Sequence, residues 1–273
     1  MKLGIFHKVF ERPTLEQSLD AVSAAGLVAV QLDLTAAGMD PAKLSDEDCD
    51  RIRTAHQERG IEVAALSGTF NIIDPDREAR RLGMEWLDAL AAVSGKIGTG
   101  LITTCTGTRD PDSLWSFHPD NHTPEAWADM VAAIEQAVQI AEARGVTLVF
   151  EPEVNNVVDS AQKARRLLDQ VASDHLQVVI DGANLFHAGE LPRMREVLDE
   201  AFDLLADSIR LAHAKDLEQD GDAGHQAAGT GLLDYDHYLA LLRQIGFDGA
   251  LILHSLEEGQ VESSSAFVRE RMR

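Results

Sequence analysis

Four side chains that could bind a metal or transfer protons each stand directly after a short apolar run. They are two carboxylates followed by two imidazoles, Glu151, Asp181, His213 and His254. Neighbouring members are 30 to 41 residues apart, which is the length of one strand followed by one helix. Such a mixed oxygen and nitrogen set suits a divalent metal ion, Mn, Co, Zn or Mg. The pattern predicts one shared metal site, at which Glu151 and His254 are also the candidate catalytic residues.

The elements that position these side chains form a regular series. We predict strands at 3–6, 28–32, 63–66, 100–103, 147–150, 177–180, 209–212 and 250–253. Each run is short and continuously apolar, as in a parallel sheet that is covered on both faces. Eight β/α units of about 34 residues fill the 273 residues, which predicts a single-domain (β/α)8 TIM barrel over 1–273. The alternative, a doubly wound sheet, lacks a G-x-G-x-x-G motif after the first strand.

Capping residues predict where several helices begin and end. Thr14 with Gln17 forms a capping-box pattern. Thr123 followed by Pro124 predicts the start of a long helix that ends near Arg144 and Gly145. Four further glycines are predicted to close helices just before the next strand, namely Gly26, Gly60, Gly95 and Gly246.

In a closed barrel the four strand ends converge on one axial site. Any one of the four side chains could instead be a helix N-cap or a salt-bridge partner. A set in the same relative position on four consecutive strands favours the shared site.

The order Glu151, Asp181 and then His213-x-Lys215-Asp216 resembles the xylose isomerase-like TIM barrel superfamily. This superfamily contains sugar (phosphate) isomerases and epimerases, and also endonuclease IV. Segments 229–231, 234–235 and 246–249 are similar to that family's region between strands seven and eight. The resemblance covers essentially the whole chain, and its motifs define the superfamily better than the substrate.

The resemblance implies a divalent metal held by Glu151, Asp181 and His213. In family members that epimerise ketoses, a strand-eight Glu completes the metal site and exchanges a proton with the strand-five carboxylate across an enediolate. This chain has His254 at that position, and it has Asn184 where many relatives carry His. His254 could bind the metal or act as an acid or base, because imidazole does both near neutral pH. The symmetric two-Glu mechanism is therefore in doubt.

Chemical reasoning leads to similar roles. A metal chelated by the carbonyl and hydroxyl oxygens of a sugar stabilises an enediolate, and Glu151 or Glu153 could be the base. Lys215 could neutralise the enediolate or a phosphate, and Arg109 could bind an anionic group of the substrate. The candidate substrate-binding residues are Glu153, Asn184, Lys215, Arg109, His225 and Asn71.

The longest connections, 108–122 and 217–234, follow the fourth and seventh predicted strands and are candidate lids over the active site. The first contains Arg109 and Trp115, and the second contains His225. Asp33 and His7 follow the second and first strands and could also contact sugar hydroxyls. Cys105 lacks a basic neighbour and is predicted to be a small buried residue.

Four functions remain open at this level. The first is a metal-dependent isomerase or epimerase acting on a sugar, a sugar phosphate or a related polyol. The second is a dehydratase or lyase for a keto-polyol, in which the same enediolate loses a hydroxyl. The third is an endonuclease IV-like hydrolase, which needs additional His ligands that strands three and four lack. The fourth is a non-catalytic sugar-binding barrel, which the His254 and Asn184 departures favour.

Composition limits the partners. Lys and Arg number 24 against 46 Asp and Glu, so the net charge of −22 argues against nucleic-acid binding. Two cysteines predict a reducing, cytoplasmic location, and the early charges argue against a signal peptide. No apolar run approaches the roughly 20 residues of a membrane span. We therefore expect a small-molecule sugar-like substrate, and a homo-oligomer is possible because similar barrels often form dimers or tetramers.

Overall fold

The strands of the computed structural model, which describes residues 1–273, form a closed ring. Eight strands pair in parallel around it, and the pairing of β6 with β7 completes the closure. These strands are β1 (Lys2–Phe6), β2 (Ala29–Leu32), β3 (Glu62–Ser67), β4 (Leu101–Cys105), β5 (Thr147–Glu151), β6 (Leu176–Asp181), β7 (Ile209–Asp216) and β9 (Ala250–Leu253). A short strand, β8 (Gln226–Ala227), pairs antiparallel with the end of β7. The predicted (β/α)8 TIM barrel is confirmed.

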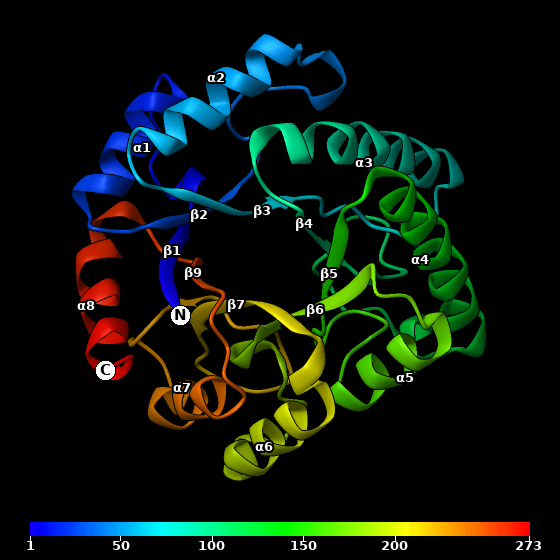
Figure 1. The fold of residues 1–273 in the computed structure, drawn as a ribbon. Coiled ribbons are helices and arrows are strands. Elements are labelled where there is room, and N and C mark those ends of the chain that lie inside the picture. The colour runs from blue at the N-terminus through cyan, green and yellow to red at the C-terminus, as the bar shows by residue number, and fades with distance from the viewer.

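The helices surround the ring of strands on the outside (Figure 1). They are α1 (Leu15–Ala24), α2 (Asp46–Gln57), α3 (Arg77–Ile97), α4 (Pro124–Arg144), α5 (Ala161–Val171), α6 (Met194–Leu205), α7 (Tyr235–Gln244) and α8 (Val261–Arg271). Helix α8 lies next to α1, where Arg269 donates to the carbonyls of Ala25 and Gly26. The last helix thereby completes the outer layer. No helix is long and apolar enough to cross a membrane.

Most of the predicted helix ends are observed. The Thr14 side chain accepts a hydrogen bond from the Gln17 amide, and α4 runs from Pro124 to Arg144 with Gly145 in the left-handed conformation. The prediction for Gly95 is wrong, because α3 continues through it and ends at Gly98 with φ of 111°. The left-handed backbone that ends a helix is needed only at the true C-cap, and Gly98 provides it.

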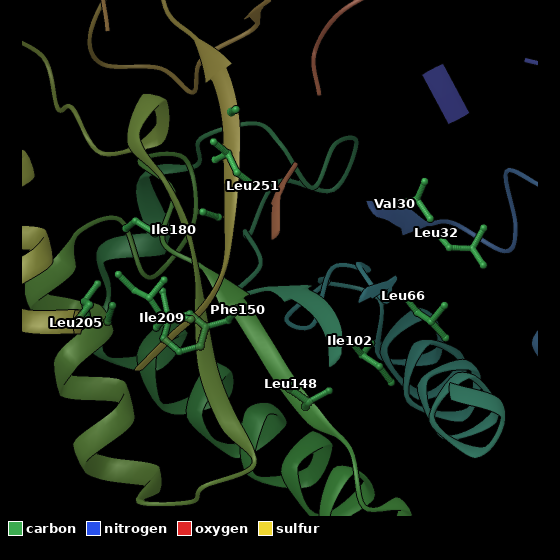
Figure 2. Close-up of a cluster of buried hydrophobic side chains, with 14 of the residues drawn as sticks. Val30, Leu32, Leu66, Ile102, Leu148, Phe150, Ile180, Leu205, Ile209 and Leu251 are labelled. Carbon is green, nitrogen blue, oxygen red and sulfur yellow. The ribbon is translucent and has the colours of Figure 1, made fainter. Parts of the chain in front are cut away.

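The apolar core has two layers. A cluster of 68 residues fills the space between strands and helices, and a cluster of 8 fills the barrel interior. Figure 2 shows part of the outer layer, including Leu148, Phe150 and Ile180. The inner cluster consists of Ala29, Ala64, Ala65, Val149, Val179, Leu211, Ala250 and Ile252. Small and branched side chains suit this narrow interior.

Strand alternation connects the inner layer to the candidate site. In β5, Val149 belongs to the inner cluster and Phe150 to the outer one. Because side chains alternate along a strand, Glu151 faces inward like Val149. The same spacing of two positions along the strand separates Val179 from Asp181, Leu211 from His213 and Ile252 from His254. The apolar filling of the barrel is therefore followed by one layer of carboxylates and imidazoles.

Candidate active site

The four predicted metal ligands meet at the carboxyl-terminal end of the barrel. The Nε2 atom of His254 lies 3.0 Å from Oδ2 of Asp181. The Nδ1 atom of His213 lies 3.4 Å from Oε2 of Glu151 and 4.0 Å from Oδ2 of Asp181. The ligand atoms of Asp181, His213 and His254 all lie within 4.8 Å of one another. Residues more than 100 positions apart in the sequence thus form one cluster.

Each carboxylate of the cluster has one oxygen held by a neighbour. The Asn184 amide donates to Oε1 of Glu151 at 2.6 Å, and the Ala183 amide donates to Oδ1 of Asp181 at 2.9 Å. The other oxygen of each carboxylate faces the imidazoles. Asn184 is fully buried and also accepts from the Gly224 amide. It acts on the cluster by orienting Glu151.

The cluster fits a divalent cation. The buried Nδ1 atom of His213 has no hydrogen-bond partner, although two carboxylate oxygens face it. A buried polar atom usually has a partner, and a bound ion is one way to supply it. Two carboxylates and up to two imidazoles match the ligands that such ions take in proteins.

Lys215 adds a buried positive charge next to the carboxylates of the cluster. Its Nζ atom is buried and lies 3.6 Å from Oδ2 of Asp181. Burial on its own raises the pKa of Asp181, but Lys215 and the hydrogen bond from His254 outweigh it and hold that pKa below its usual range. Burial on its own lowers the pKa of Lys215. The surrounding carboxylates raise it by more, so the net shift is upward and the ammonium keeps its proton. Asp181 is therefore ionised.

His254, a member of the cluster, and Glu153, which lines the same cavity, are neutral near pH 7. Burial lowers the pKa of His254 to about 4, so its Nε2–H donates to Asp181 as a neutral imidazole. Burial also raises the pKa of Glu153 to about 8, and its Oε1 has no hydrogen-bond partner. A neutral imidazole and a protonated carboxylic acid are suited to accept and to donate a proton, respectively.

A cavity of about 820 Å³ opens above the cluster. Both predicted lid segments line it, the first through Leu114 and Trp115 and the second through Ala223 and His225. The buried Asn155 connects these segments, because its amide donates to the Trp115 carbonyl at 3.0 Å and to Asp222 at 2.7 Å. The volume is in the range of sites that enclose a small molecule.

Comparison with known proteins identifies the family. The model of the xylose isomerase-like TIM barrel family matches residues 19–271. The chain belongs to the xylose isomerase-like TIM barrel family. This confirms the assignment made from the order of the strand-end residues.

Several members of this family are similar along the whole chain. A ketose 3-epimerase from Arthrobacter globiformis is 23% identical over 272 residues, which cover 96% of this chain and 86% of that protein. An L-ribulose 3-epimerase structure superimposes with a TM-score of 0.78 at 18% identity, covering 99% of this chain and 94% of that one. The probable 3-DHS dehydratase AsbF from Bacillus anthracis gives 0.78 at 15% identity, covering 100% and 99%. At these identities the two solved structures show the fold alone.

Half of the predicted substrate-binding residues of this xylose isomerase-like chain line the cavity. Glu153, Lys215 and His225 line it together with Glu151, His213 and His254. Asp33 also lines it, whereas the largely buried His7 lines a second cavity and accepts from the Asp33 amide. Cys105 is buried, as predicted, and burial raises the pKa of its thiol to about 12.

Arg109 and Asn71 do not reach the lining. The Arg109 guanidinium donates to Asp129 on α4 at 2.7 Å and to the Ile73 carbonyl, so its charge is already paired. The Asn71 amide pairs with the backbone of Thr108 in both directions, at 2.9 and 3.0 Å. Both residues contact the loop after β4 in this structure, and the anion contact of Arg109 and the sugar contact of Asn71 stay predictions.

Three side chains at the site were missed from the sequence. Gln31 on β2 lies 2.9 Å from Nε2 of His213, and Phe6 packs its ring against both His213 and His254 at centroid distances of 5.7 and 5.3 Å. Asn155 links the two loops. A signal existed for Gln31, because it is the one polar residue in the apolar run 28–32.

Proposed function

We propose that this protein is a divalent-metal-dependent isomerase or epimerase that acts on a ketose or a related polyol through an enediolate. One observation carries the proposal, namely the partnerless Nδ1 of His213 facing the carboxylates of Glu151 and Asp181 at the base of a cavity. The similarity to a ketose 3-epimerase along 96% of the chain supports it.

Glu151, Asp181 and His213 would hold the cation, with His254 as the candidate fourth ligand. When bound, the cation supplies a Lewis acid that polarises the substrate carbonyl and offsets negative charge on the neighbouring oxygens. Lys215 keeps Asp181 ionised for this role. Its buried positive charge also adds to the field that favours an anionic substrate state.

The proton transfers fall to side chains with suitable charge and position. Glu151 has Oε1 held by Asn184, which leaves Oε2 toward the cavity as the candidate base. The neutral His254 next to Asp181, in place of the strand-eight Glu of family epimerases, is the candidate for accepting a proton, and the protonated Glu153 is the candidate for donating one. Groups of this kind contribute about 10²–10⁴-fold to the rate.

A second candidate, a keto-polyol dehydratase, is favoured by Glu153. Burial keeps this carboxyl protonated near neutral pH, and it lines the same cavity as Glu151. A neutral acid can donate a proton to a departing hydroxyl. Both candidates begin with proton removal next to a carbonyl and differ only in what happens afterwards.

The test begins with metal analysis of the purified protein, followed by chelation and reloading with Mn, Co, Zn or Mg. The reloaded protein is then incubated with ketoses, their phosphates and keto-polyols in D₂O. Deuterium incorporation at an inverted carbon supports the epimerase, and loss of water supports the dehydratase. Binding of sugars without either reaction would instead support a non-catalytic sugar-binding barrel.

Glu151→Gln provides the decisive variant, and Glu135→Gln on the exposed face of α4 provides its control. We expect Glu151→Gln to lower metal-dependent turnover by at least about 10²-fold and Glu135→Gln to leave it unchanged. Full turnover by Glu151→Gln would overturn the proposal.

The same proposal includes the expected partners. The substrate is a small sugar-like molecule, and the net charge of −22 disfavours nucleic acid. A homo-oligomer and a cytoplasmic location stay predictions, which size-exclusion chromatography with light scattering and cell fractionation can test.

A further inference from the structure

We propose that Gln31 is a positioning residue that holds His213 in its Nε2–H tautomer and thereby directs the Nδ1 lone pair to the cation site. The inference rests on the metal-dependent function proposed above and names a residue that prepares the ligand set for the cation. It follows from a chain of hydrogen bonds inside the barrel.

The first link is the orientation of the Gln31 amide. Its Nε2 atom lies 3.1 Å from Oγ of Ser67 and 3.1 Å from Oγ1 of Thr103. The Thr103 hydroxyl donates its hydrogen to the Leu66 carbonyl at 3.5 Å, so it accepts from Gln31. The NH₂ group of Gln31 thus has two acceptors on β3 and β4, and Oε1 is left to face His213.

The second link is the tautomer of His213. Its Nε2 atom lies 2.9 Å from Oε1 of Gln31. A carbonyl oxygen can only accept, so the hydrogen must be on the imidazole nitrogen. In a neutral ring the other nitrogen, Nδ1, then carries a lone pair.

The third link is the direction of that lone pair. The Nδ1 atom of His213 is buried without a hydrogen-bond partner, 3.4 Å from Oε2 of Glu151. A lone pair facing a carboxylate is repulsive, and both groups would be suited to hold a divalent cation. The other imidazole nitrogen of a metal-binding His usually donates to an oxygen that fixes the ring and its tautomer. Gln31 supplies that oxygen.

The barrel makes this arrangement rigid. Gln31 is 2% exposed and follows the inner-cluster residue Ala29 by two positions, so it faces the barrel interior. Ser67 and Thr103 stand at paired positions of β3 and β4. The chain of hydrogen bonds therefore crosses the barrel from β4 to β7, and Gln31, Ser67 and Thr103 line the same cavity as His213.

The tautomer is measured in the metal-free full-length protein by long-range ¹H–¹⁵N correlation NMR with ¹⁵N-histidine, at about pH 8. His213→Gln identifies the signals of His213 among the 10 histidines. We expect hydrogen on Nε2 in the wild type and a shift toward hydrogen on Nδ1 in Gln31→Met. A wild-type His213 with its hydrogen on Nδ1 would overturn the proposal without any variant.

Calorimetric titration with Mn²⁺ provides the second readout. We expect Gln31→Met to weaken cation binding by about 10–100-fold. Gln177→Met, on β6 and outside the cavity lining, is the matched control and should change neither the tautomer nor the affinity. An unchanged tautomer and an affinity within about twofold of wild type in Gln31→Met would contradict the proposal.

The two readouts separate this inference from the function on which it rests. One combination of results separates them: the wild type has the hydrogen on Nε2 of His213, Gln31→Met does not, and no divalent cation binds to the wild type. In that case the metal-dependent function fails. The positioning role of Gln31 is then supported on its own.

Discussion

The Nε2 atom of His254 lies 3.0 Å from Oδ2 of Asp181, an oxygen that also faces Lys215 and His213. This oxygen is the centre of the cluster, because an imidazole, an ammonium and a second imidazole approach it from three sides. His254 stands at the end of β9 and is the fourth member of the cluster. Its contact with Asp181 leaves it able either to bind a cation or to transfer a proton.

Changing His254 separates these two roles. His254→Gln keeps a side-chain amide that can donate to Asp181 but cannot accept and release a proton at neutral pH. We expect turnover to fall by about 10²–10⁴-fold while cation affinity, measured by titration calorimetry, falls by less than about tenfold. A large loss of cation affinity would instead identify His254 as an essential ligand.

Changing Asn184 tests the orientation of Glu151. Asn184→Leu removes the donor that holds Oε1 of Glu151 at 2.6 Å. We expect kcat to fall by about 10–100-fold with a small change in KM, because the loss affects the geometry of the base more than substrate binding. Asn184→His restores a donor and should recover part of kcat. Equal losses in both variants would contradict the orienting role.

The Glu153 carboxyl predicts a pH-dependent change in stability. Its folded-state pKa of about 8 lies above the ordinary value of 4.5, so the folded protein keeps a proton that the unfolded chain releases between these values. This contribution is complete below pH 4.5 and is lost as the pH rises through 8. Glu153→Gln, which mimics the protonated acid, should therefore gain stability over wild type as the pH rises from 5 to 8.

Urea unfolding of the metal-free protein checks this prediction. The expected gain is on the order of 4 kcal/mol near pH 7.5 and falls below about 1 kcal/mol at pH 5. Glu135→Gln on the exposed face of α4 should show no such trend. A gain that is independent of pH would mean that Glu153 is not protonated in the folded state.

Cation binding should stabilise the fold. The ligands come from β5, β6 and β7 and from the end of β9, so they are assembled only in the folded chain. At a cation concentration of 100 times Kd the gain is about 2.7 kcal/mol. Thermal unfolding with and without Mn²⁺ should show a higher Tm in the loaded protein and a return to the lower value after chelation. Asp181→Asn should abolish the difference.

Much of the barrel could be predicted from local patterns. Short apolar runs predict strands because the barrel strands are buried on both faces. Period-two alternation then carries the inward direction from Val149 to Glu151 and from Ile252 to His254. Gly95 and Gly98 show the limit of this reasoning, since both glycines suit a helix end and only the backbone conformation distinguishes them.

The series of β/α units was enough to predict the barrel, and alternation within each strand was enough to predict the layer of Glu151, Asp181, His213 and His254. The contacts that those side chains make depend on the tertiary structure. Gln31 meets His213 across 182 positions, and Arg109 turns to Asp129 instead of the cavity. These pairings depend on ring closure and on competition among nearby partners. Hydrogen-bond geometry in three dimensions, which no spacing encodes, selects among them.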